Sequence, residues 1–300
     1  MRELPNPLLS ISLLGENFAG NIKSNIHQKF SQMLPNQISS KFKNKPLSEV
    51  IQHPEIQAPV SKKNAGRIQV SWASNEDEVK EAQRLRYKVF CEEMGARLPA
   101  HPENLDVDIF DKYCDHLLVR DQETLKVIGT YRVMPPHQAK LMGCLYSDSE
   151  FDLVRLNHLR HKIVEVGRSC VHQDYRSGGV IMALWGGLGK YMQEHGYEIM
   201  LGCASVPMAD GGHYAASLNR MIQEQHLSPI EYRAFPRLAL PLEALNSTLE
   251  IDAPPLIKGY MRIGAKICGD PAWDPDFNTA DFLTILRLSD INQRYAKHFL

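Results

Sequence analysis

Residues 163–179, which read IVEVGRSCVHQDYRSGG, decide the fold of this chain. The apolar residues of 163–172 predict a buried strand, and the glycine turn after it leads into an apolar helix over 179–195. Gly196 ends this helix, and a further strand follows over 198–205. Strand, helix and strand in this order predict a crossover that sets the two strands parallel in one sheet.

The segments before this crossover predict an antiparallel part of the same sheet. Alternating apolar and polar residues indicate a first strand over 68–72, and a capping-box-like start at 74–77 begins a helix that runs to Gly95. Strands over 116–120 and 127–134 flank a short polar turn, which predicts a hairpin.

The segments after the crossover predict a helix near 212–226, a proline-rich connection, and two late strands near 257–268 and 279–288. The complete order predicts an α/β (α+β) fold. Its central sheet would be mixed, mostly antiparallel, and flanked by helices.

Composition excludes several classes of protein. The chain has 34 Lys and Arg against 35 Asp and Glu, a net charge of −1, and nucleic-acid binding needs a positive surface instead. The six cysteines are dispersed without a CxxC pair, so we expect no metal site and a reducing, cytoplasmic location. No apolar run predicts a membrane span, and the start of the chain does not resemble a secretory signal.

Charge divides the chain near residue 66. Residues 1–66 carry eight Lys and Arg against four Asp and Glu, a net of +4, whereas residues 67–300 carry a net of −5. Apolar side chains in steps of three or four predict an amphipathic helix over 8–34, and a flexible basic linker follows it. That helix is either an anchor on an anionic membrane or a helix that packs on the domain of residues 67–300.

Arg86 and Phe90 lie four residues apart, on one face of the first predicted helix. Arg86 is near the apolar side of this helix, and a buried guanidinium needs an acidic partner. Asp108 and Asp111, in an acidic loop over 97–114, are the candidate partners. Such pairing would hold the loop over the helix and close a site beneath it.

Glu165 and Arg168 stand within the buried strand, where a charged pair is costly unless it is paired or faces a cavity. An offset of three places side chains on opposite faces of a regular strand, so either Gly167 permits a bulge or each residue serves a different side. We expect Glu165 to be a general base or a carboxylate that orients an amine. The alternative is a structural ion pair with Arg168 or Arg132.

Seven phrases, in order along the chain, carry a family resemblance: LRYKVFCEEMGA (85–96), DVDIFDKYCDHLLVRD (106–121), GTYRV (129–133), EVGRSCVHQDYRSG (165–178), GCAS (202–205), PPLIKGYMRIGA (254–265) and FNTADF (277–282). Over about residues 68–288 the chain resembles the amino-acid N-acyltransferases of the GNAT superfamily that use acyl-carrier-protein thioesters. It looks most like the ornithine N-acyltransferases that are often labelled hemolysin-like. This resemblance implies a GNAT-like central sheet.

A more distant resemblance links the chain to the acyl-homoserine-lactone synthases. The tryptophan that those synthases have after the Phe is absent here, where Gly95 and Ala96 stand, so their substrate S-adenosylmethionine is not supported. Together the resemblances imply catalytic roles for Glu165, Arg168 and Arg132. They imply substrate binding by Arg86, Phe90, Asp108, Asp111, Ser169 and Cys203.

The turn Arg176, Ser177, Gly178 and Gly179 is similar to the phosphate-binding signature of the superfamily, except that Ile181 replaces its final small residue. Free N–H groups at a helix start favour a phosphate. The departure at Ile181 would suit the single phosphate of a carrier-protein phosphopantetheine in place of the pyrophosphate of coenzyme A.

The implied reaction moves a (3-hydroxy)acyl chain from acyl carrier protein to the α-amine of an amino acid, with L-ornithine expected and lyso-ornithine lipid as product. No cofactor would be bound permanently. Two basic groups of residues are candidates for docking the acidic carrier protein: Arg155, Arg160 and Lys162, and Lys258, Arg262 and Lys266.

Two alternatives stay open. The acceptor would be glutamine, lysine, glycine or tyrosine in the first, and the protein would be a non-catalytic, membrane-active, hemolysin-like protein in the second. In either case the expected location is cytoplasmic, with peripheral contact to the inner membrane through residues 8–34.

Overall fold

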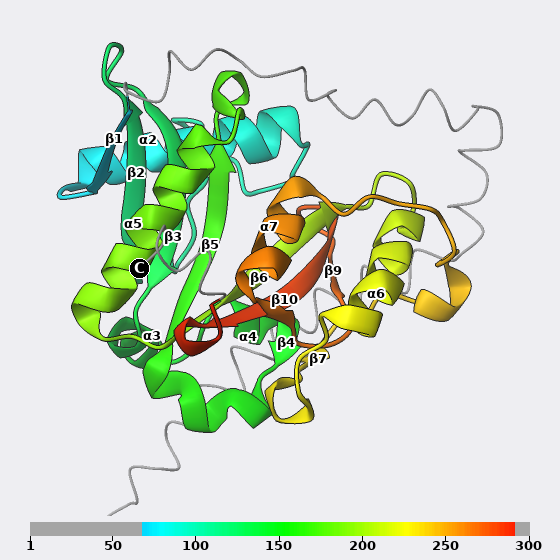
Figure 1. The fold of residues 1–300 in the computed structure, drawn as a ribbon. Helices are drawn as coiled ribbons and strands as arrows, with labels where there is room; N and C mark the ends of the chain where they lie inside the picture. The colour runs from blue at the N-terminus through cyan, green and yellow to red at the C-terminus, as the bar shows by residue number, and fades with distance from the viewer. Residues whose placement is uncertain (1–67, 292–300) are drawn as a thin grey trace, which may run out of the picture. The chain divides into compact units, whose positions relative to one another are not determined.

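The computed structural model describes residues 68–291, which form one central sheet with helices on both faces (Figure 1). The strands of this sheet, in spatial order, are β1 (Ile68–Trp72), β2 (Asp115–Asp121), β3 (Val127–Met134), β5 (Ile163–Val171), β6 (Ile199–Pro207), β10 (Thr279–Arg287) and β8 (Lys266–Ile267). β9 (Ala272–Asp274) also pairs with β10, and β4 (Phe151–Asp152) pairs separately with β7 (Phe235–Pro236).

Every pair in this sheet is antiparallel except β5 with β6. The parallel pair is the crossover around α5 (Gly179–His195), which Gly196 ends in a left-handed conformation at φ +67°. The prediction of a mixed, mostly antiparallel sheet flanked by helices is therefore confirmed.

The helices divide between the two faces of the sheet. α2 (Glu76–Tyr87) packs on one face through Ala82 and Leu85, and α3 (Pro136–Met142) and α4 (Ser147–Glu150) lie on that same face. α5, α6 (His213–Gln225) and α7 (Pro255–Ile263) cover the other face, which is turned toward the viewer in Figure 1. We call these the α2 face and the α5 face.

One predicted strand is wrong. The segment near 257–268 forms α7 and only a two-residue strand, β8. Its apolar residues recur at helical spacing, Pro255 stands in the first turn, and Gly264 follows the last turn at φ +110°. These are helix signals, and they outweigh the short apolar run that suggested a strand.

β5 and β6 part soon after they begin. Residues 163–165 of β5 pair with residues 199–201 of β6, and the two strands do not pair with each other beyond these residues. A Cβ atom on Gly202 would lie 2.1 Å from the carbonyl oxygen of Val166. Glycine at this position therefore lets the two backbones approach closely at the point where they separate.

A bulge interrupts β5 just beyond this point. The register against β3 changes between Thr130, which lies opposite Cys170, and Arg132, which lies opposite Gly167. Arg168 takes the left-handed conformation, with φ +49°, whereas Gly167 does not. The predicted bulge is confirmed, but the strained residue is the arginine, because its side chain is held by partners described below.

The expected helix at 8–34 and the linker after it lie outside the described residues. Within residues 68–291, no helix combines the length and the apolar character that a membrane crossing requires.

Gly202→Ala tests the close approach of the two strands. We expect a loss of about 1–3 kcal/mol of unfolding free energy, because the added methyl group would overlap the Val166 carbonyl. Thermal or urea unfolding measures the loss. Gly186→Ala, in α5 with no atom within 4 Å of the added Cβ, is the matched control and should leave stability equal or higher. Equal effects of the two variants would contradict the packing described here.

Candidate active site

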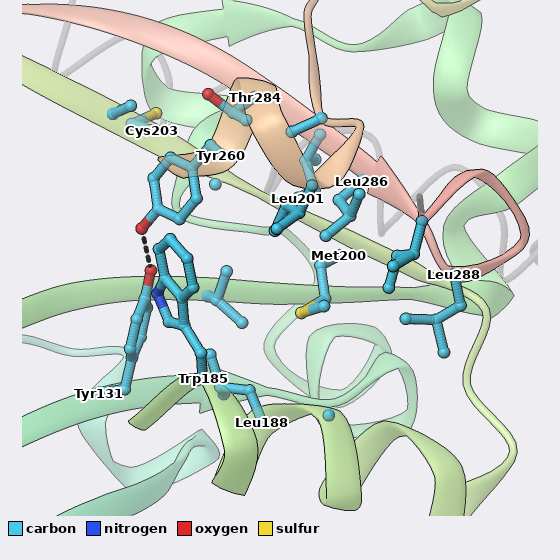
Figure 2. A pocket seen from close by; sticks show the side chains of 17 residues that line it. Tyr131, Trp185, Leu188, Met200, Leu201, Cys203, Tyr260, Thr284, Leu286 and Leu288 are labelled. Carbon is cyan, nitrogen blue, oxygen red and sulfur yellow. Dashed lines mark hydrogen bonds between the residues drawn. The ribbon is translucent and has the colours of Figure 1, made fainter. Parts of the chain in front are cut away.

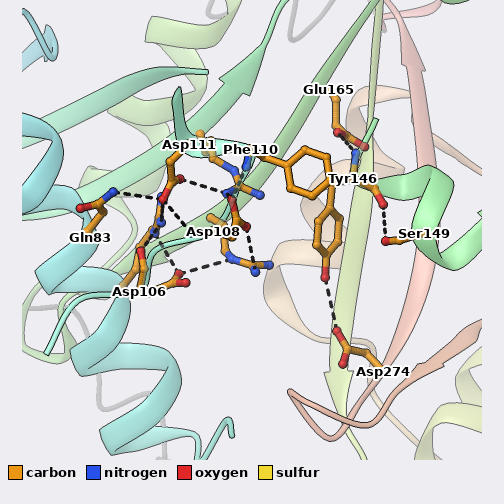
Figure 3. Close-up of polar contacts among 12 residues, drawn as sticks. Gln83, Asp106, Asp108, Phe110, Asp111, Tyr146, Ser149, Glu165 and Asp274 are labelled. Atoms are coloured by element: carbon orange, nitrogen blue, oxygen red, sulfur yellow. Dashed lines mark hydrogen bonds and ion pairs between the residues drawn. The ribbon is translucent and has the colours of Figure 1, made fainter. Parts of the chain in front are cut away.

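Three arginines and three aspartates form one network on the α2 face, in which four members are buried and Asp108 and Arg168 are partly exposed (Figure 3). The arginines come from α2, β3 and the β5 bulge, whereas the aspartates come from one loop that runs before β2. The members are Arg86, Arg132, Arg168, Asp106, Asp108 and Asp111. Since the formal charges balance, the network can be buried without a net charge.

Arg86 is the centre of the network and is fully buried. Its Nε donates to Asp106 Oδ2 at 2.9 Å, and its Nη2 donates to Asp111 Oδ2 at 2.8 Å and also to the Asp106 carbonyl. Gln83 Nε2 donates to the same Asp111 carboxylate at 3.0 Å. The prediction that Arg86 pins the acidic loop onto the first helix is confirmed for Asp111, but the second partner is Asp106 and not Asp108.

Asp108 instead joins the two arginines of the sheet. Arg132 Nη1 donates to Asp108 Oδ1 at 2.7 Å and to Asp111 Oδ1 at 3.0 Å. Arg168 Nη2 donates to Asp108 Oδ2 at 3.3 Å, and Arg168 Nε lies 3.3 Å from Asp106 Oδ2. The network therefore ties α2, the loop, β3 and the β5 bulge together.

Electrostatics keep three members of the network ionised. Burial opposes the charge on Asp111, but the neighbouring Arg86 and Arg132 guanidinium groups outweigh this effect and hold the pKa of Asp111 well below its usual range. Burial likewise opposes the charge on Arg132 and Arg168. Nearby aspartates keep the pKa of Arg132 above its ordinary value, and Tyr146 together with Asp106 and Asp108 does the same for Arg168. Asp111, Arg132 and Arg168 are thus charged at neutral pH and unsuited to proton transfer.

Aromatic rings separate the network from the rest of the site. The Tyr146 ring centroid lies 5.9 Å from the Arg132 guanidinium carbon and 5.0 Å from that of Arg168. Phe277 lies 4.5 Å from the same Arg168 carbon, and its edge meets Phe90 with centroids 5.7 Å apart. Phe90 therefore contacts this site through Phe277, not through Arg86.

Glu165 is buried at the last position at which β5 pairs with β6. Its two carboxylate oxygens accept the backbone N–H groups of Tyr146 at 2.6 Å and of Ser147 at 2.7 Å. Burial raises the pKa of Glu165 although these hydrogen bonds oppose the rise. Among the described residues it makes no ion pair with Arg132 or Arg168, and both of its oxygens are already engaged in holding the start of α4.

A second group of acids lies on the other side of the Tyr146 ring. The ligand atoms of Glu150, Cys203 and Asp281 lie within 4.8 Å of one another, and the Tyr146 hydroxyl donates to Asp274 Oδ2 at 3.4 Å. Burial and mutual repulsion raise the pKa of Glu150 well above its usual value, and burial also raises the pKa values of Asp281 and Asp274. We call Glu150, Asp274 and Asp281 the carboxyl cluster.

Two members of this cluster, Glu150 and Asp281, form with Cys203 a set of described residues that could hold a cation, whether a metal ion or an ammonium group. Cys203 donates from Sγ to Glu150 Oε2 at 3.6 Å, and burial raises the pKa of its thiol. Cys203 is therefore a neutral neighbour and not a thiolate nucleophile.

An apolar cavity of about 70 Å³ lies on the α5 face, beside the parted strands (Figure 2). Val166, Gly202 and Cys203 border it from β5 and β6, and Trp185 and Tyr260 border it from α5 and α7. The Trp185 and Tyr260 rings stack with centroids 5.3 Å apart, and the Tyr131 and Tyr260 hydroxyls lie 2.6 Å apart. Cys203 is thus shared by the cavity and the carboxyl cluster.

The remaining predicted residues lie close to this junction or beyond it. Ser169 is half-buried in β5 next to the bulge. Arg176 donates to the Val171 carbonyl at 3.0 Å and pairs with Glu93, while Gly178 takes a left-handed conformation and α5 begins at Gly179. The first turn of α5 lacks a side-chain cap, so its N–H groups remain open to an anion.

The sequence analysis missed Tyr146 and the carboxyl cluster. Asp281 had a signal, because a charged residue inside the apolar strand TADFLTILR is as costly as Glu165 inside its own strand. No comparable signal in the sequence pointed to Glu150 and Tyr146. Glu150 lies in the short helix α4 and Tyr146 directly precedes it, and only the fold brings them to β6 and β10.

Comparison with known proteins shows what the chain is similar to. A family model described as an acetyltransferase (GNAT) domain matches residues 85–186. The chain is 38% identical over 251 residues to an L-ornithine N(alpha)-acyltransferase of Agrobacterium fabrum, which covers 78% of this chain and 85% of that protein. It is 36% identical over 250 residues to an enzyme of the same name from Brucella abortus, with 78% and 89% covered.

Among solved structures, a CoA-dependent acyl-homoserine lactone synthase in complex with MTA matches at 16% identity, a TM-score of 0.47, and coverage of 78% of this chain and 87% of that one.

The Arg–Asp network predicts a specific loss of stability in acid. A carboxylate whose pKa is lowered by folding stabilises the protein above the unfolded pKa, about 3.9 for Asp, and this contribution disappears as pH falls through the folded pKa. Asp111→Asn should therefore lower the unfolding free energy at pH 7, and the difference from the original protein should shrink at pH values below about 4. Urea unfolding from pH 7 to 3 measures it, and a difference that stays constant would contradict the network.

Proposed function

Because this chain belongs to the L-ornithine N(alpha)-acyltransferase family, within the GNAT superfamily, we propose that it transfers a (3-hydroxy)acyl chain from acyl carrier protein to the α-amine of L-ornithine. The product would be lyso-ornithine lipid. One observation supports this proposal above the others: the parted strands β5 and β6 have an apolar cavity on one side and a cluster of carboxyl groups on the other, with Cys203 next to both. A thioester held in the gap would meet an amine there.

The apolar cavity is the proposed site of the acyl chain. Its walls are aliphatic and aromatic side chains between α5 and α7. At about 70 Å³ it is smaller than the roughly 150 Å³ cavity that holds a benzene molecule. A long acyl chain therefore requires the stacked Trp185 and Tyr260 rings, which close the cavity between the two helices, to move apart.

The carrier protein would approach from the α5 face. Arg176 and the open N–H groups at Gly178 and Gly179 are the proposed contacts of the phosphopantetheine phosphate. Lys258 and Arg262 lie on α7, the helix that carries Tyr260 over the cavity, and they are the proposed contacts of the acidic carrier. Lys258 pairs with the exposed Asp252, so docking would exchange this partner for an acid of the carrier.

The amino-acid acceptor would bind on the α2 face. The aspartates of the Arg–Asp network already have arginine partners, which leaves the carboxyl cluster to receive a cationic substrate. Burial raises the pKa values of its three carboxyl groups, and repulsion from neighbouring carboxylates adds to the rise at Glu150 and Asp274. The side-chain ammonium of ornithine would supply a positive charge that favours their ionised forms.

The reaction needs a group that removes a proton from the α-ammonium. Glu165 holds the backbone of Tyr146 and Ser147 with both of its oxygens, so we assign it a positioning role. Glu150 has a raised pKa and borders Cys203 at the gap, and it is the proposed general base. The freed amine attacks the thioester carbonyl carbon, the C–S bond breaks, and the thiolate of phosphopantetheine leaves and takes up a proton.

A pH profile of turnover separates the two glutamates. The rate should rise with pH through the raised pKa of Glu150, because only the ionised carboxylate accepts a proton. Glu150→Gln should lower kcat by about 10²–10⁴-fold and remove this rise. Glu165→Gln should lower kcat less and keep the rise, since it disturbs only the position of Tyr146 and Ser147. Loss of the rise in Glu165→Gln alone would make Glu165 the base.

Acceptor selectivity tests both the activity and the role of the carboxyl cluster. Purified full-length protein with 3-hydroxyacyl carrier protein should form N-acyl ornithine, detected by mass spectrometry, and should prefer ornithine to norvaline, which lacks only the side-chain ammonium. Asp281→Asn should reduce this preference by at least about tenfold, because a buried ammonium would lose a charged partner. Glu243→Gln, an exposed acid on a distant 3₁₀ turn, is the control that should change nothing.

Parallel reactions with glutamine, lysine, glycine and tyrosine cover the alternative acceptors. Absence of product with every amine would contradict the acyltransferase proposal and favour a non-catalytic role. An ornithine preference that survives in Asp281→Asn would leave the activity intact but place the side-chain ammonium elsewhere.

A further inference from the structure

Three neighbouring segments form a distinct surface: α3 over residues 136–142, residues 151–162, and residues 228–237. We call it the Arg155 face. β4 pairs with β7 between Phe151 and Pro236, Arg155 Nη1 donates to the Ile230 carbonyl at 2.8 Å, and α3 packs against residues 154–162. α3, β4 and β7 lie along the lower part of Figure 1, away from the turn between β2 and β3 at the top.

Large apolar side chains gather on this face and point to solvent. Val154, Ile230 and Phe235 are 61%, 65% and 56% exposed, and Leu141 of α3 is 71% exposed. In the described part of the chain only two other large apolar residues are exposed by more than half, Leu125 at 66% and Ile109 at 51%. Single exposed apolar residues are ordinary, but four of the five most exposed ones lie in these three segments.

The same face is basic within an acidic domain. Its segments contain six Lys and Arg (Lys140, Arg155, Arg160, Lys162, Arg233 and Arg237) and two acids (Asp152 and Glu231), a net charge of +4. Residues 68–291 as a whole hold 23 Lys and Arg against 31 Asp and Glu, a net charge of −8. Arg160 and Lys162 pair with Asp148 and Glu198, and a net of +2 remains after these two acids are included.

Arg155 joins the two features. Its guanidinium carbon lies 5.2 Å from the Phe235 ring centroid, while its Nη1 donates a hydrogen bond to the Ile230 carbonyl. It therefore holds a charged group between two exposed apolar side chains. Apolar tips that enter the acyl boundary, beside cations at headgroup level, are the pattern by which proteins bind the surface of an anionic bilayer.

We propose that the Arg155 face binds peripherally to a membrane rich in anionic lipid. Val154, Ile230 and Phe235 enter the interface, and Arg155 and Arg237 contact lipid phosphates. An acidic carrier protein would also complement the positive charge of this face, but charge complementarity alone does not account for three apolar side chains exposed to solvent. The proposal does not depend on the acyltransferase reaction, although a lipid product would leave directly into such a membrane.

Vesicle co-sedimentation of the full-length chain tests the proposal. Binding to phosphatidylcholine vesicles with 30% phosphatidylglycerol should exceed binding to pure phosphatidylcholine, and added salt should weaken it. The triple variant Val154→Ser, Ile230→Ser, Phe235→Ser should bind at least about tenfold more weakly, because apolar area buried in the interface sets the affinity. Its turnover with soluble substrates should equal that of the original protein.

The control removes the same number of exposed apolar side chains elsewhere, through Val70→Ser, Leu125→Ser and Met182→Ser. This control should keep full vesicle binding. Equal binding by the triple variant and the original protein would overturn the proposal and assign any membrane contact to residues outside 68–291. If the triple variant kept its vesicle binding but lost affinity for holo carrier protein, the face would be a docking site for the carrier protein instead.

Discussion

The separation of β5 from β6 is the constraint on which the rest of the molecule depends. Strands that stayed paired beyond Glu165 and Leu201 would seal the sheet between its two faces. Because they part, Val166 and Gly202 pair with β3 and β10 but not with each other, and our proposal places the thioester in this gap. The gap is stable only if both flanks are held from outside, and the two faces of the sheet do this in different ways.

On the α2 face, charge holds the structure. The Arg–Asp network joins α2, the loop before β2, β3 and the β5 bulge, and it keeps Arg168 in a left-handed conformation that an isolated strand would not adopt. Glu165 extends the same support to the start of α4. The arginines of the network therefore hold the structure together, and our proposal assigns the chemistry to the raised-pKa carboxyl groups next to Tyr146.

On the α5 face, apolar packing holds the structure. α5 and α7 stand on either side of the gap and meet through the Trp185 and Tyr260 rings. Such contacts are non-directional, so they can open and close at modest cost, whereas the charged network across the sheet is fixed by geometry. This difference suits a site that admits a long flexible chain from one side and recognises a small charged molecule from the other.

The sequence by itself determined most of the sheet and its crossover, and it left a bulge at Gly167 as one of two possibilities. The cost of buried charge drew attention to Arg86, Glu165 and Arg168 and to acidic partners such as Asp111, whereas the role expected of Arg132 came from a family resemblance. It did not determine which aspartate pairs with which arginine, since partners twenty or more residues apart are chosen by loop geometry. Only the tertiary structure placed Glu150 and Tyr146 beside Asp281. A carboxyl group in a short helix becomes unusual only when a distant strand buries it.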